Sequence, residues 1–151
     1  GISEVNFETF FKGNYNLLTF KNILSNEEHY ALVSKNIDTN SNVYVRMHKH
    51  SIIKDILTEK NIFDDQMKRS IEVINEKNNG VIVIINGNYA PRIEKQFSRQ
   101  KNDKFELREY GVGAQILRDI GLKNIILLTN NQKKVISLDG FDLKIIKQES
   151  F

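Results

Sequence analysis

The stretch from Phe63 to Ile85, FDDQMKRSIEVINEKNNGVIVII, carries the strongest structural signal in the chain. In its first part apolar residues recur at three- and four-residue steps, which predicts an amphipathic helix from Phe63 to Lys77. Asn78-Asn79-Gly80 follows, and glycine commonly ends a helix. Val81 to Ile85 is continuously apolar, as is typical of a strand covered on both faces. The stretch therefore predicts one helix–strand unit of a layered domain.

Similar elements lie on either side of this unit. Strands are predicted at Tyr30–Val33 and Val43–Met47, and a helix at Gly113–Ile120 that ends at Gly121. The remaining expected elements are a short helix at Ile93–Gln100, a polar loop at Gln100–Lys104, a strand at Asn124–Leu128, a helical turn at Lys133–Leu138 and a last strand at Phe141–Ile146. This alternation predicts an α/β fold with a layered mixed sheet and helices. The length of 151 residues suits one domain over residues 1–151.

Composition narrows the class of protein. The 22 basic and 19 acidic residues are scattered and leave a net charge of +3, which does not favour a nucleic-acid partner. The cysteine count is zero, so disulfides, thiolate nucleophiles and cysteine-bound zinc are excluded. The longest apolar run is too short to cross a bilayer, and no signal segment opens the chain, so we expect no membrane partner and a cytoplasmic location.

Polar residues from Thr129 to Lys134 follow the predicted strand Asn124–Leu128 directly. Ligands of open α/β sheets bind beyond the carboxyl ends of strands, so a hydroxyl, two amides and two ammonium groups there could hold a base or phosphates. The alternative is a polar turn that caps a helix.

Glu106 and Arg108 form a second candidate cluster. If their segment is extended, side chains two apart share one side, where the pair could bind phosphate and move protons. If the segment is the first turn of a helix, the carboxylate interacts with the helix dipole and the arginine is an ordinary surface residue.

His48 and His50 end a predicted strand and share a face. With Asp55 they could ligate a metal, but two histidines without a convincing third ligand are usually surface residues. We therefore expect no metal site.

Two longer motifs give the chain a family resemblance. Leu107–Gly121, with Leu127–Asn131, resembles GTP cyclohydrolase II, in the form common where that domain is the C-terminal half of a bifunctional enzyme. The N-terminal half of such enzymes is a 3,4-dihydroxy-2-butanone 4-phosphate synthase. Upstream, Glu27–Val33 and Arg46-Met47-His48 resemble two strands of the family, and the resemblance runs from about Glu8 to Ile146.

The resemblance implies a fold, a reaction and a set of site residues. In the family, zinc held by three cysteines activates water against the guanine ring, an arginine near a carboxylate attacks the α-phosphate, and magnesium assists with the phosphates. By position, Arg108 matches the attacking arginine and Glu106 its carboxylate. The positions matching substrate-binding residues are Arg46, Gln66, Thr129 and Lys134.

Other family positions have changed. The zinc cysteines correspond to Ser51 and to positions near Asn61 and Phe63, none of which is a cysteine. The Arg-Gln-Glu-Gly-Arg motif of the family has become Asn86-Gly87-Asn88-Tyr89-Ala90, and the segment Pro91–Lys104 is shorter. Without a metal-activated nucleophile, ring opening loses several kcal/mol of transition-state stabilisation.

The sequence thus predicts a degenerate cyclohydrolase-like domain, with Glu106 and Arg108 vestigial. Its expected role is structural, in folding or assembly with a synthase half of the same chain, and a homodimer is possible. The alternatives are a regulatory module that binds GTP or another nucleotide, and a zinc-independent nucleotide pyrophosphohydrolase with magnesium. Whether the domain is itself an enzyme stays open, as does zinc bound by His29, His48 and His50.

Overall fold

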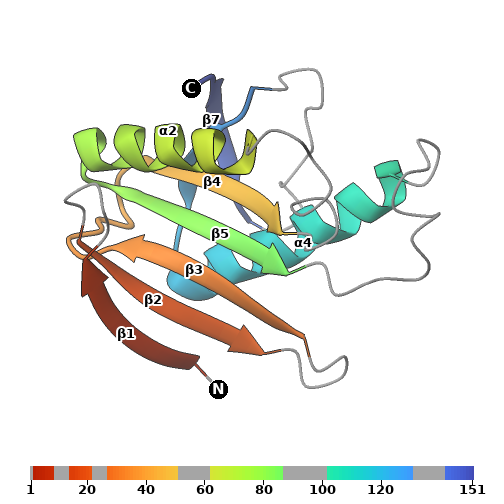
Figure 1. Cartoon of the computed structure of the whole chain (residues 1–151), viewed down its shortest axis with the longest axis horizontal. Helices are drawn as coiled ribbons and strands as arrows, with labels where there is room; N and C mark the ends of the chain where they lie inside the picture. Colours follow the sequence, from red (N-terminus) through yellow and green to blue (C-terminus); the bar gives the residue numbers. More distant parts are fainter. Residues whose placement is uncertain (1, 9–13, 22–26, 51–61, 87–101, 131–141) are drawn as a thin grey trace.

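The computed structural model describes residues 2–8, 14–21, 27–50, 62–86, 102–130 and 142–151. Within these ranges, side chains are described for residues 15–21, 27–49, 66–86, 110–130 and 142–151. Figure 1 shows a twisted sheet with one helix on each side of it. The expected α/β fold with a layered mixed sheet is confirmed.

The described strands form a seven-stranded sheet in the order β1-β2-β3-β5-β4-β6-β7. Strands β1, β2, β3 and β5 pair antiparallel with one another in this order, and β5, β4, β6 and β7 pair parallel. The strands are β1 (Ile2–Glu8), β2 (Asn14–Lys21), β3 (Glu28–Ser34), β4 (Val43–His50), β5 (Gly80–Asn86), β6 (Asn124–Leu128) and β7 (Lys144–Glu149). The helices are α2 (Ile62–Lys77) and α4 (Asn102–Ile120).

The two helices cover opposite faces because β5 is apolar on both. Ile82 packs with Ile71 and Ile74 of α2. Val83 packs in a separate cluster with Leu117 of α4. Alternate residues of a strand point to opposite faces, so the continuous run of β5 supplies both clusters. The predicted helix–strand unit is therefore confirmed, with β5 covered on both sides.

The end of α2 differs in detail from the prediction. Asn78, with φ 55°, takes the left-handed conformation that ends the helix, a role that asparagine can share with glycine. Gly80 is instead the first residue of β5, where a Cβ would lie 2.6 Å from Cγ2 of Ile74. The glycine is thus required by the close approach of helix and strand.

Helix α4 begins earlier than predicted. The segment expected to be a polar loop at Gln100–Lys104 is helical from Asn102. Gly111 and Gly113 lie inside the helix, and Gly113 faces Met47 so closely that an added Cβ would lie 3.0 Å from its sulfur. The helix therefore continues through two residues of low helix propensity. The predicted end at Gly121, with φ 101°, is confirmed.

Other predictions fare differently. The strands at Tyr30–Val33, Val43–Met47 and Asn124–Leu128 are confirmed, whereas β1 and β2 were not predicted. The final strand runs from Lys144 to Glu149 rather than from Phe141 to Ile146, because pairing with β6 continues through polar residues. The expected elements at 93–100 and 133–138 lie outside the described residues.

Candidate binding pocket

The chain topology places a crevice between β4 and β6. The chain leaves β4 through α2 to reach β5 on one side, and leaves β6 to reach β7 on the other side. Both strands are parallel, so their carboxyl ends lie together. Such a switch point is where open α/β sheets bind ligands.

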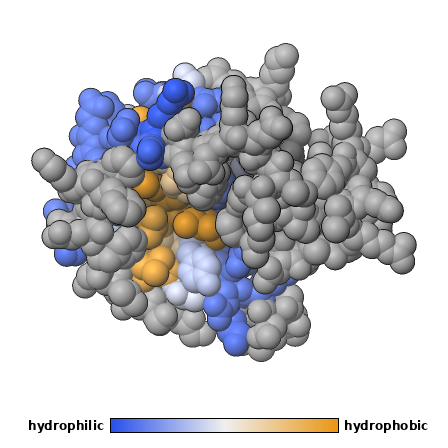
Figure 2. Space-filling model, viewed as in Figure 1, coloured by the Kyte–Doolittle hydropathy of each residue, from blue (hydrophilic) through white to orange (hydrophobic). Residues whose placement is uncertain are grey.

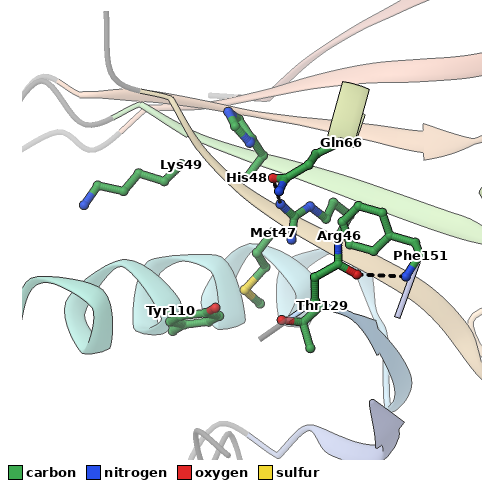
Figure 3. A pocket seen from close by; sticks show the side chains of 9 residues that line it. Arg46, Met47, His48, Lys49, Gln66, Tyr110, Thr129 and Phe151 are labelled. Atoms are coloured by element: carbon green, nitrogen blue, oxygen red, sulfur yellow. Dashed lines mark hydrogen bonds between the residues drawn. The ribbon is translucent and has the colours of Figure 1, made fainter. Parts of the chain in front are cut away.

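A pocket of about 420 Å³ lies at this point. It combines two cationic side chains with amide, hydroxyl, imidazole and aromatic groups. Its lining residues are Arg46, Met47, His48, Lys49, Gln66, Tyr110, Thr129, Asn130 and Phe151. They come from β4, α2, α4, the two residues that follow β6, and Phe151 after β7. Figure 3 shows the lining side chains around the end of β4.

Arg46 lies in the middle of this set. Its Nη1 donates to the carbonyl oxygen of Leu128 at 3.4 Å, and its Nη2 donates to Oε1 of Gln66 at 3.4 Å. Its Nε is buried and has no hydrogen-bond partner among the residues that the structure describes. Since Nη1 and Nη2 each carry two N–H groups and use one of them here, the guanidinium keeps donor capacity for an acceptor in the pocket.

Phe151 stacks on the same guanidinium. The Cζ of Arg46 lies 4.8 Å from the centre of the Phe151 ring, within the range of a cation–π contact. The backbone N–H of Phe151 donates to Oδ1 of Asn130 at 3.0 Å, which holds the ring over the pocket (Figure 3). Desolvation lowers the pKa of Arg46, and Tyr110 acts in the opposite direction. The group stays cationic because arginine is deprotonated only far above neutral pH.

The pocket reaches both faces of the sheet. Arg46 and His48 alternate along β4 with Met47 and Lys49, so the two pairs belong to opposite faces. Gln66 of α2 lines the pocket on the face of Arg46 and His48, and Tyr110 of α4 lines it on the opposite face. The end of β4 thus places basic, polar and aromatic groups around one cavity.

The structure brings together three of the predicted site residues. Arg46, Gln66 and Thr129 line the same pocket although they are far apart in sequence. Lys134 lies outside the described residues. Their roles in substrate binding stay predictions.

Glu106 and Arg108 belong to α4. The structure describes their backbone but not their side chains. The premise that their segment is extended is wrong, because residues from Asn102 onward are helical. Residues two apart in a helix do not face each other, so the shared side inferred from an extended segment no longer applies. Their catalytic roles are neither supported nor contradicted by any described contact.

The histidines do not form one described cluster. Strand register pairs Tyr30 with Ile84 and Ile84 with His48, so His29 belongs to the opposite face from His48. His29 is buried, accepts the backbone N–H of Asn86 at Nδ1 (3.1 Å), and directs Nε2 toward Glu27 at 3.5 Å. Burial lowers its pKa, and the Glu27 carboxylate opposes that shift.

The donor set does not fit the zinc of the resembled family. No cysteine occurs in the sequence, and the described residues contain no group of three histidine, cysteine or acidic side chains that could hold a metal. The side chains of His50, Ser51 and Asp55 lie outside the described set. We therefore derive no chemistry through zinc.

Sequence reasoning missed several residues of the pocket. Met47 lies within the motif Arg46-Met47-His48 and Lys49 follows it, so strand alternation alone could have included both. Tyr110 lies in a quoted motif but was given no role. Phe151 carries no local signal, because only the pairing of β7 with β6 brings it to Arg46.

Fold and pocket together define a mixed α/β domain with a candidate binding pocket at its topological switch point. Residues 1–150 match the family model of GTP cyclohydrolase II, and the chain belongs to that family. Within the described residues, no helix is long and apolar enough to cross a membrane.

Similar proteins extend beyond this domain. The riboflavin biosynthesis protein RibBA of Bacillus cereus is 30% identical over 96% of this chain and 41% of its own length. The RibBA proteins of Bacillus mycoides and Bacillus cytotoxicus are 30% and 28% identical over the same shares. The chain thus spans about two fifths of these relatives.

A solved structure has the same fold. It is the crystal structure of RibBX, a two-domain 3,4-dihydroxy-2-butanone 4-phosphate synthase from A. baumannii, with a TM-score of 0.59 and 22% identity. The match covers 98% of this chain and 38% of that chain.

Proposed function

We propose that this domain of the GTP cyclohydrolase II family does not open the guanine ring and serves in assembly with a 3,4-dihydroxy-2-butanone 4-phosphate synthase half. The observation that carries the first part is the absence of cysteine from the sequence. Zinc lowers the pKa of its bound water enough to make a nucleophile at neutral pH, and a chain without the thiolate ligands forfeits that step. We also propose a cytoplasmic location, which is supported by the similarity to riboflavin biosynthesis proteins.

The assembly role is supported by the relatives and by an apolar hollow. The relatives are about two and a half times as long as this chain, and the matching solved structure is a two-domain synthase. Figure 2 shows apolar side chains gathered near the middle of the face that carries α2. On this face the partly buried Leu17 and Ile84 pack beside the buried Leu32 and Ile82. The partly exposed Leu17 and Ile84 are thus the members of this cluster that a partner could cover.

The test has two readouts. First, the domain is incubated with GTP, zinc and magnesium, and formate and the diaminopyrimidine product are measured; neither is expected, and either would refute the loss of ring opening. Second, the synthase half is supplied as a separate chain, and association and synthase activity are measured. Leu17→Glu should weaken both association and synthase activity. Ile146→Glu should weaken neither, because Ile146 is 42% exposed and lies on the distant strand β7. Thermal midpoints of both variants control for unfolding, and the mass of the domain alone tests for a homodimer.

A second candidate, binding of a nucleotide or another oxyanion, is favoured by the pocket itself. Arg46, Lys49 and Thr129 put two cations and a hydroxyl around one cavity at the switch point. A ligand present at a hundred times its dissociation constant should raise the unfolding free energy by about 2.7 kcal/mol. Thermal melts with GTP, GMP or pyrophosphate, with and without magnesium, measure this, and Arg46→Gln should abolish the shift. Pyrophosphate released from GTP in an Arg108-dependent way would instead indicate residual pyrophosphohydrolase activity.

A further inference from the structure

The stack of Phe151 on Arg46 is the feature of the pocket that neither the motifs nor the family pattern accounts for. Phe151 lies one residue beyond the range 1–150 that matches the family model. It nevertheless lines the pocket and packs against the apolar cluster beneath α2. The residue thus joins the core to the charged centre of the site.

The hydrogen bonds of Arg46 are too long to fix its guanidinium alone. Both are 3.4 Å, whereas N–H···O bonds in proteins usually measure about 2.7–3.2 Å. A long side chain held by two weak bonds would otherwise retain much of its rotamer freedom. The ring of Phe151 restricts that freedom from one face, at 4.8 Å from Cζ.

The Phe151 ring leaves the donors of the guanidinium available. A phenyl ring carries no oxygen or nitrogen, so its contact with Cζ at 4.8 Å uses none of the N–H groups. The ring instead excludes water from the face and lowers the local dielectric. Both effects strengthen a charge-assisted bond from the second N–H of Nη1 or of Nη2, each of which makes one hydrogen bond within the protein.

We propose that Phe151 is a positioning residue, which holds the Arg46 guanidinium in place to bind an oxyanion such as a phosphate or pyrophosphate group. The proposal rests on the oxyanion-binding candidate above. Phe151 itself is tied down by its backbone N–H on Asn130 and by the neighbouring β6–β7 contact, in which the N–H of Thr129 donates to the carbonyl of Glu149 at 2.9 Å. The C-terminal strand thereby controls the affinity of the pocket.

The experiment measures binding of inorganic pyrophosphate to the whole chain by calorimetry. Phe151→Leu keeps an apolar side chain of similar bulk and removes the π face. We expect binding about threefold to thirtyfold weaker than in the unaltered chain, with little change in thermal midpoint. The matched control is Tyr44→Leu, which removes the other described cation–π contact, with Lys77 at 5.7 Å, and should leave the affinity unchanged.

A second readout observes Arg46 without a ligand. The proton on its Nε should exchange slowly with water in nuclear magnetic resonance spectra of the unaltered chain and of Tyr44→Leu, and faster in Phe151→Leu. Equal pyrophosphate affinity for the unaltered chain and Phe151→Leu would overturn the positioning role. Failure of the unaltered chain to bind pyrophosphate, with its Nε proton still protected, would overturn the oxyanion site itself, which is a separate failure.

Discussion

Replacement of Gly80 by alanine tests the packing that joins α2 to β5. An alanine Cβ would lie 2.6 Å and 2.8 Å from Cγ2 and Cγ1 of Ile74, and 3.0 Å from the carbonyl oxygen of Tyr44. Ile74 is fully buried, and both contacting carbons are branches on its own Cβ, so rotation cannot clear them both. The clash must therefore move the helix or the strand.

The backbone at Gly80 has little room to move. Its N–H donates to Oγ of Ser34 at 3.0 Å, and its carbonyl accepts from the same hydroxyl at 3.0 Å. The N–H of Tyr44 donates to the carbonyl of Asn79 at 3.0 Å, so retreat of the neighbouring strand would break that bond. Overpacking of this kind costs about 3 kcal/mol, and the reduced freedom of the unfolded chain returns about 0.7 kcal/mol. We expect a net loss of about 2 kcal/mol.

Urea unfolding at equilibrium measures the loss. Gly113→Ala is the matched control, since its Cβ would meet chiefly the flexible end of Met47, at 3.0 Å from the sulfur, and helix propensity favours alanine by about 1 kcal/mol. It should be neutral or stabilising. A double-mutant cycle isolates the cause: Gly80→Ala should cost much less when Ile74→Ala has already removed the clashing carbons. The reasoning is refuted if Gly80→Ala costs under about 0.5 kcal/mol, or if its cost is the same in the Ile74→Ala background.

Three further predictions concern hydrogen-bonded side chains. The Tyr15 hydroxyl donates to Asn75, and burial raises its pKa to about 12. The stability that it contributes is therefore full below pH 10 and is lost as the pH rises toward 12. Tyr15→Phe should remove this loss, so that stability between pH 10 and 12 falls by up to about 2.7 kcal/mol less than in the unaltered chain. The pKa of the buried His29 imidazole is lowered from 6.5 in the folded chain. Its contribution to the free energy of unfolding is therefore present above pH 6.5 and is lost as the pH falls through the folded-state pKa. His29→Gln should make stability fall less steeply with acid, and an unchanged profile would contradict this. The Nδ2 of Asn79 donates to the carbonyls of Asp38 (3.4 Å) and Asn42 (3.2 Å). Asn79→Asp removes both bonds and should cost about 2 kcal/mol in urea unfolding. The control Asn78→Asp, at the exposed neighbouring residue, should cost little.

The sequence predicted the elements whose signal is local. Helix α2 and strand β5 could be predicted because an apolar period and a continuous apolar run are properties of neighbouring residues. Strand β2 was missed although Tyr15 and Leu17 alternate with Leu18 and Phe20, since both sets are apolar and the alternation is masked. Each set packs in a different cluster, which only the completed sheet reveals.

The same distinction holds for the pocket. Thr129 could be predicted as a site residue because it follows a recognisable strand, and Arg46 because its motif resembles a substrate strand of the family; the parallel pairing of β4 with β6 then brings them together. The interaction between Arg46 and Phe151 could not be predicted, because the two residues are far apart in sequence and meet only when β6 and β7 add to the sheet beside β4. Glu106 and Arg108 show the converse: their spacing suggested a shared side only for an extended chain, and the segment is helical.

The proposed function separates binding geometry from reactive chemistry, so that a domain of this fold can have the pocket without the ring-opening reaction. The crevice at the switch point follows from strand order and from the direction of each connection, which the apolar pattern of β5 and β6 specifies. The metal chemistry of the resembled family depends instead on a few thiolates, and this sequence contains no cysteine. The described core consists of packed apolar side chains, and Arg46 is held by Leu128, Gln66 and Phe151, so neither depends on a thiolate. A pocket retained in this way can serve binding or regulation, and the affinity for pyrophosphate is the quantity that distinguishes a working site from a remnant of the fold.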